Sequence, residues 1–116
     1  MSEQEDIKRY FANRQKEIDG AALYKVLADT EKQPQMAEVY RKLAASEEKH
    51  ASAWEKKLTD LKVALPPRKP TWRAATMIWL ARRFGPQFVL PTIASNEKAD
   101  SRAYDGHVSL PKNSAR

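Results

Sequence analysis

The sequence predicts an all-α fold whose main part is an antiparallel hairpin of two long helices. Its 116 residues include only three glycines, and no segment alternates apolar and polar residues as a strand does. Two stretches, 5–31 and 36–61, carry apolar residues three and four positions apart, which is the spacing of one helical face. The segment "EKQPQ" at 31–35 separates them, and so short a connection makes the two helices antiparallel neighbours.

These spacings define one apolar face on each helix. The first helix carries Ile7, Tyr10, Phe11, Ile18, Ala21, Leu23, Tyr24, Leu27 and Ala28. The second helix carries Met36, Val39, Tyr40, Leu43, Ala44, Ala51, Trp54, Leu58 and Leu61. Both patterns persist over the full length of their stretch, so the two faces are expected to pack on each other along the hairpin.

Prolines end the hairpin, and a new helix begins after them. The segment "LPPRKP" at 65–70 stops the second helix, because proline lacks a backbone donor and restricts the residue before it. The segment "TWRAATMIWLARRF" at 71–84 starts another helix with Thr71 as its N-cap, and the following "GP" breaks it. A last helix is expected from about 89 to 104, followed by an irregular tail at 105–116.

The composition excludes several classes of protein. Apolar residues make up 41% of the chain, which argues against disorder. There is no cysteine, so disulfides, thiolate chemistry and cysteine-based zinc sites are excluded. No stretch reaches the roughly 18–20 apolar residues of a transmembrane helix, and the charged N-terminus has no secretory pattern. We therefore expect a cytoplasmic protein, either free or at the inner face of a membrane.

The net charge is +6, and the excess lies in one segment. Residues 61–96 contain no Asp or Glu but include Lys62, Arg68, Lys69, Arg73, Arg82 and Arg83. Such a segment can attract phosphate groups or an anionic membrane surface, or it can be a solvated face without a partner. No nucleic-acid recognition motif accompanies the charge, so we expect no nucleic-acid partner.

The second helix carries two titratable residues where its apolar face predicts core positions. Glu47 and His50 occupy consecutive steps of the stripe between Leu43 and Trp54. A buried carboxylate beside a histidine is unfavourable unless the two are paired or bind a metal. The Glu-x-x-His spacing puts both side chains on one helical face, as in helical carboxylate metal sites. The motif alone is weak evidence, and its position on the apolar stripe is the stronger indication of a metal site.

The register of the hairpin brings a third ligand to the same level. With the turn centred near residue 32 or 33, antiparallel packing places Glu47 opposite residues 17–19, where Glu17 is found. Both glutamates are about 15 residues, or roughly 22 Å, from the turn. We therefore expect Glu17, Glu47 and His50 to converge between the helices. The competing interpretation leaves Glu17 on the surface, within the polar run "RQKEIDG".

These motifs resemble the first half of a rubrerythrin-type ferritin-like domain. In that family a glutamate precedes a tyrosine by seven residues, as Glu17 precedes Tyr24, and the next helix carries Glu-x-x-His-Ala, as at 47–51. The later segment 70–104 is similar to the crossover and third helix of the membrane-bound ferritins, in which the domain precedes a vacuolar-iron-transporter-like domain. The resemblance covers about residues 5–104. It implies a four-helix bundle that binds two irons and has ferroxidase or peroxide-reducing activity.

The resemblance also implies how the chain is divided. It predicts a ferritin-like domain at 1–104, made of a hairpin (5–62), a proline-rich linker (63–70) and the crossover and third helix (71–104). Glu97 precedes Tyr104 by seven residues and is the counterpart of Glu17 in the second half. The second Glu-x-x-His, expected about 30 residues later, has no counterpart within the 116 residues. We therefore expect an incomplete bundle, truncated before the fourth helix.

The candidate site follows from these residues. The candidate metal ligands are Glu17, Glu47, His50 and Glu97. Tyr24 and Tyr104 are candidate hydrogen-bond donors to them, and Trp54, one turn after His50, is expected to pack in the core beside them. Carboxylates with an imidazole suit Fe(II), Mn(II) or Zn(II).

One chain offers too few ligands for the two metals that the family binds. It could hold one metal weakly, or a two-fold homodimer could rebuild a six-ligand site from Glu17, Glu47 and His50 of each copy. Iron is the expected metal and manganese the alternative. The remaining possibility is a vestigial domain that binds no metal.

A second function class is a non-catalytic interaction module. Residues 71–90 form a basic amphipathic segment that could dock on a membrane surface, an iron-transporter domain or another partner protein. Trp72 and Trp79 lie seven residues apart and therefore on one side of the helix. The alternative interpretation is that these aromatic residues pack the crossover helix on the hairpin. Metal analysis of the purified protein discriminates between the two function classes.

Overall fold

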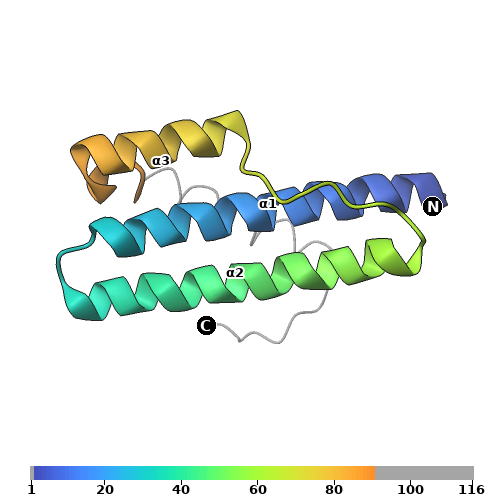
Figure 1. Cartoon of the computed structure of the whole chain (residues 1–116), viewed down its shortest axis with the longest axis horizontal. Helices are drawn as coiled ribbons and strands as arrows, with labels where there is room; N and C mark the ends of the chain where they lie inside the picture. The colour runs from blue at the N-terminus through green and yellow to red at the C-terminus, as the bar shows by residue number, and fades with distance from the viewer. Residues whose placement is uncertain (1, 91–116) are drawn as a thin grey trace.

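The computed structural model describes residues 2–90, which fold into helices, as the sequence predicts (Figure 1). Helix α1 spans Glu3–Thr30, α2 spans Pro34–Asp60 and α3 spans Trp72–Phe84. A short 3₁₀ helix, η1, follows at Pro86–Phe88. The all-α class is confirmed. The expected third bundle helix at 89–104 lies almost entirely outside the described residues, and the tail lies wholly outside them.

Local sequence signals set the ends of the hairpin helices. Ser2 caps α1: its hydroxyl accepts a hydrogen bond from the Glu5 amide, and the Glu5 carboxylate accepts one from the Ser2 amide. This reciprocal capping box satisfies two amides that the first turn cannot pair. Residues 31–33 form the turn, and Pro34 takes the first position of α2, where its missing amide hydrogen costs nothing.

Small residues let the two long helices approach closely. The residues that α2 buries are Ala37, Tyr40, Ala44, Ala51 and Leu58. Tyr40 stacks on Tyr24 of α1 with ring centroids 6.4 Å apart. Leu27 and Leu58 are fully buried near opposite ends of the hairpin.

The apolar stripe predicted for α2 is only partly correct. Met36, Val39 and Leu43 were expected in the core but are 37–46% exposed. The reason is the position of α3, which lies on α1 and, among the described residues, makes no contact with α2 (Figure 1). Helix α2 therefore buries one narrow face on α1. The apolar residues beside that face, Met36, Val39 and Leu43, stay at the surface.

The linker between α2 and α3 runs back along α1 and is anchored to it (Figure 1). The Asp19 carboxylate accepts hydrogen bonds from the Thr71 amide at 2.9 Å and from the Thr71 hydroxyl at 2.8 Å. The same Thr71 hydroxyl accepts a hydrogen bond from the Ala74 amide, which caps α3 as the sequence predicts. Asp19 therefore positions the start of α3 against α1.

The tryptophans of α3 do not pack on the hairpin. Helix α3 turns Ala74 and Ala81 toward α1 and buries them, whereas Trp72 is 75% exposed and Trp79 is 58% exposed. The interpretation of these two residues as core packing of the crossover helix is therefore wrong. Within residues 2–90, no helix combines the length and apolarity that crossing a bilayer requires.

Candidate metal centre

Glu17, Glu47 and His50 meet between α1 and α2. One ligand atom from each side chain lies within 4.8 Å of the other two. The His50 Nδ1 atom is 3.3 Å from a Glu17 carboxylate oxygen and 3.8 Å from a Glu47 carboxylate oxygen. In the part of the chain that the structure describes, this is the one group of three or more acidic, His or Cys side chains arranged in this way.

Hairpin register produces this convergence. The turn at 31–33 sets Glu17 and Glu47 at the same level, and Glu47 and His50 share a face because they are three residues apart. At the surface, Lys25 of α1 pairs with Glu48, the residue that follows Glu47 on α2. Ala51, which follows His50 in the sequence, is 1% exposed, and its small side chain lets the helices lie close at this level.

The three side chains differ in their exposure to solvent. The Glu17 and Glu47 side chains are 13% and 19% exposed, and the His50 side chain is 56% exposed. The carboxylates therefore lie inside the hairpin and the imidazole lies at its edge. An ion would reach the carboxylates from the side of His50, which is the exposed member of the group.

Gly20 supports the centre and was not singled out from the sequence. A Cβ atom at this position would lie 3.3 Å from Glu47 Cδ and 3.5 Å from Glu47 Cγ. The Glu47 side chain thus rests against the backbone of α1 at Gly20, so closely that a methyl group there would require the side chain to shift by a few tenths of an ångström. Glycine inside a helix costs about 1 kcal/mol relative to alanine, so its presence here calls for a reason. The sequence feature that could have identified Gly20 is an isolated glycine in the middle of a helix, opposite the Glu-x-x-His motif.

The structure places some of the residues that were predicted to lie beside the ligands, and others lie outside the described residues. Tyr24 is buried and stacks on Tyr40, whose pKa is raised by burial and then by the Glu31 carboxylate. Trp54 packs on Tyr10 with ring centroids 5.6 Å apart, but both residues are only partly buried, so Trp54 lies at the edge of the core and not within it. The role of Tyr24 as a hydrogen-bond donor to the ligands stays a prediction. Glu97 and Tyr104 lie outside the described residues.

A second acidic residue of α2, Glu55, is occupied by arginines instead. Arg14 donates to one Glu55 oxygen at 2.8 Å, and Arg68 of the linker donates to both oxygens at 2.8 and 2.9 Å. Mainly through the Arg68 hydrogen bonds, and against a smaller opposing effect of burial, the pKa of Glu55 falls to about 2. Glu55 therefore serves as the anion of an ion-pair network that we call the arginine clamp (Arg14, Glu55 and Arg68).

The donor set of the candidate centre suits a divalent transition metal. Two carboxylates and one imidazole, without thiolate, match Fe(II), Mn(II) or Zn(II) by ligand softness. The space left for Glu47 at Gly20 and the spacing within 4.8 Å fit side chains that share one ion. Three protein ligands leave coordination positions open, which is the arrangement of reactive rather than purely structural metal sites.

Comparison with known proteins places this hairpin in a family. A family model described as Rubrerythrin matches residues 12–78, which include Glu17, Glu47 and His50. Searches of curated proteins and of solved structures gave no match. The family match covers more than half of the 116 residues, including all of α2 and the part of α1 that carries Glu17. The chain therefore belongs to the rubrerythrin family.

Proposed function

We propose that this protein binds iron through Glu17, Glu47 and His50, and that it has ferroxidase or peroxide-reducing di-iron activity when a second copy completes the site. The observation that carries the proposal is the convergence of the three ligand atoms within 4.8 Å, inside a domain of the rubrerythrin family. Manganese is the alternative metal, because the same oxygen and nitrogen donors suit it.

Each ligand residue would have a distinct part in binding. Glu17 and Glu47 would supply negatively charged oxygens from a partly dehydrated position, where their attraction for a cation is less screened than at the surface. His50 would supply one ring nitrogen at the open edge of the site. Bound iron would provide electron exchange with O₂ or H₂O₂, and the residues around it would hold it and limit access of water.

A second copy is the proposed source of the remaining ligands. The exposed residues Met36, Val39 and Leu43 continue along α2 toward His50 on the same side of the helix. We call these three residues the α2 stripe. Apolar side chains beside an open site favour association, and a two-fold axis through this face would bring Glu17, Glu47 and His50 of both copies together. Glu97 stays a proposed further ligand, and a cytoplasmic location stays a prediction.

Anaerobic titration of the purified 116-residue chain with Fe(II) tests the metal site. We expect one metal per chain, with binding abolished in His50→Leu. His107→Leu is the matched control, because His107 is the other of the two histidines of the chain and is expected to leave binding unchanged. The thermal midpoint of metal-free His50→Leu should equal or exceed that of the wild type, since a half-exposed imidazole contributes little packing.

Two results would contradict the proposal. One is wild-type protein that takes up no Fe(II) or Mn(II). The other is binding that falls equally in His50→Leu and His107→Leu, because the centre would then not depend on the imidazole beside Glu17 and Glu47.

A further inference from the structure

We propose that the outer face of α3 docks the protein on an anionic lipid surface. The α3 face consists of Trp72, Arg73, Trp79, Arg83, Phe84 and Phe88. It is independent of the metal centre, which lies between α1 and α2, because α3 contacts α1 and, among the described residues, does not reach α2. The proposal therefore does not rest on the proposed metal binding.

Exposure is the first observation. The exposed fractions are 75% for Trp72, 58% for Trp79, 50% for Phe84 and 54% for Phe88. Three of these rings form a continuous surface: Trp79 meets Phe84 edge to face at 6.1 Å, and Phe84 meets Phe88 at 5.5 Å. Contiguous exposed apolar surface of this kind marks a protein or membrane interaction site.

The helix is built to present this surface outward. Ala74 and Ala81 are buried against α1, and their small side chains bring the helix close to it. Trp72 and Trp79, seven residues apart, consequently lie together on the opposite side. The Thr76 hydroxyl between them donates back to the Trp72 carbonyl oxygen at 2.9 Å, so its hydrogen atom is not available to an outside partner.

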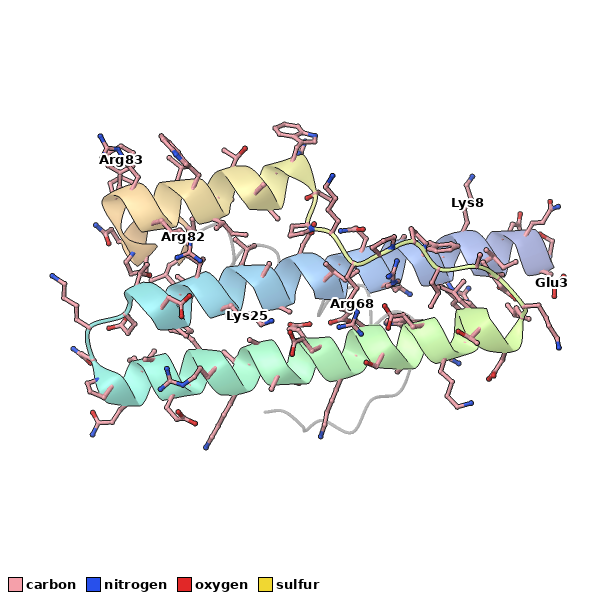
Figure 2. All side chains as sticks on the ribbon, in the orientation of Figure 1. Glu3, Lys8, Lys25, Arg68, Arg82 and Arg83 are labelled. Carbon is pink, nitrogen blue, oxygen red and sulfur yellow. The ribbon has the colours of Figure 1, made fainter. Side chains whose placement is uncertain are left out.

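Cations accompany the aromatic rings. The guanidinium groups of Arg73 and Arg83 lie 5.7 Å from the Trp72 ring centroid and 5.8 Å from the Phe84 ring centroid. Arg82 is different, because it pairs with Asp29 of α1 at 3.7 Å. Figure 2 shows Arg83 on the side of α3 that points away from α1 and Arg82 on the side that faces it. The segment 61–96 contains no Asp or Glu to neutralise the exposed arginines.

This combination of groups fits a lipid surface better than a second copy of the chain. Tryptophan and arginine side chains have apolar bodies with polar ends, and they settle at the boundary between headgroups and acyl chains. A layer of anionic headgroups would supply the negative charge that the α3 face lacks. A two-fold contact between two α3 faces would instead bring Arg73 and Arg83 of both copies together, which like-charge repulsion opposes.

Vesicle binding of the 116-residue chain tests this inference. We expect binding to vesicles of phosphatidylcholine with phosphatidylglycerol, and little binding to phosphatidylcholine alone. Arg73→Gln/Arg83→Gln should weaken binding by about tenfold or more, because two charges at the lipid surface are lost. Lys42→Gln/Lys49→Gln removes the same charge from exposed positions on α2 and should change binding by less than about twofold, since those lysines face away from the lipid.

Tryptophan fluorescence gives a second readout that locates the contact. The three tryptophans of the chain are Trp54 in the hairpin and the two on the α3 face. With vesicles whose acyl chains carry bromine, emission from Trp54→Phe protein should be quenched. Emission from Trp72→Phe/Trp79→Phe protein, in which only Trp54 remains, should not change.

Three results would overturn the inference. Equal weakening by the arginine and lysine variants would show that net charge, not the α3 face, attracts the vesicles. Equal binding to neutral and anionic vesicles would remove the electrostatic argument. An α3 face that binds no vesicles, but whose Trp79→Ala change dissociates a dimer, would be a surface between two copies of the chain.

Discussion

Two glutamates of α2, Glu47 and Glu55, have different roles: Glu47 belongs to the candidate metal centre and Glu55 to an ion-pair network. Glu55 is held by Arg14 and Arg68, so its charge is neutralised by the protein itself. Glu47, two turns earlier on the helix, lies beside Glu17 and His50 and against the backbone at Gly20. Sequence spacing identified Glu47 because of its histidine, but it did not identify the partners of Glu55. Arg14 and Glu55 are 41 positions apart, and no local pattern links them.

Gly20→Ala should separate metal binding from stability. The added methyl group meets Glu47 Cδ at 3.3 Å, so the carboxylate must move by about a few tenths of an ångström. We expect metal affinity to fall by about tenfold, the scale seen when a group that positions a ligand is disturbed. The free energy of unfolding of the metal-free protein should rise, by up to about 1 kcal/mol, because alanine favours the helix. Metal titration and thermal denaturation measure the two effects.

The outcome that contradicts this prediction is a loss of both properties. Reduced stability together with reduced affinity would mean that Gly20 serves helix packing rather than the position of Glu47. Ala22→Gly offers a matched comparison, because it adds a glycine to the same helix two residues away and is expected to lower stability without a specific effect on metal binding.

The arginine clamp should make part of the stability pH-dependent. The pKa of Glu55 is about 2 in the folded protein, against an ordinary value of 4.5. A lowered folded-state pKa stabilises the fold above pH 4.5, and this contribution is lost as the pH falls from 4.5 toward 2. We expect Glu55→Gln to cost about 2 kcal/mol at neutral pH. The difference from wild type in urea denaturation should shrink as the pH approaches 2. A difference that stays constant over this range would contradict the assigned pKa.

At the level of elements, the hairpin could be predicted and the neighbours of its helices could not. The turn and the two apolar periodicities define the register, which is why Glu17 and Glu47 were expected at one level. Periodicity does not tell how many neighbours a helix has. The sequence therefore predicted that all the apolar positions of α2 lie in the core, although Met36, Val39 and Leu43 are exposed. The same limitation applies to α3, because an aromatic pair at heptad spacing fits a buried face and an exposed face equally well.

The attachment of α3 should depend on Asp19. Its carboxylate accepts hydrogen bonds from both the amide and the hydroxyl of Thr71, and from the Gln15 side chain at 3.0 Å. Asp19→Ala removes these bonds and should destabilise the start of α3 by about 1–3 kcal/mol. Hydrogen exchange should then become faster in 66–84 while Fe(II) affinity stays unchanged. The reverse result, slow exchange in α3 with impaired metal binding, would contradict a role limited to the linker.

At the level of the whole molecule, α1 is the shared layer between two surfaces of different chemistry. Its contact with α2 holds the acidic candidate centre, and its contact with α3 turns the α3 face outward (Figure 1). The sequence showed that the positive excess lies in the acid-free segment 61–96, after the hairpin that carries the candidate ligands. The sequence did not predict which way the metal centre and the α3 face point, because that depends on the side of α1 on which α3 packs.

Assembly should be linked to metal binding through the α2 stripe. If Glu17, Glu47 and His50 of two copies hold metal together, the metal binds only the dimer and shifts the equilibrium toward it. We expect sedimentation velocity to show stronger self-association after addition of Fe(II) or Mn(II). Val39→Glu places a charge on the stripe at a position that is 46% exposed, so the fold should survive while the dimer and the metal affinity are both reduced. Trp79→Glu is the matched control on the α3 face and should leave both unchanged. A monomer with and without metal would exclude the shared site and leave a hairpin that binds at most one ion weakly.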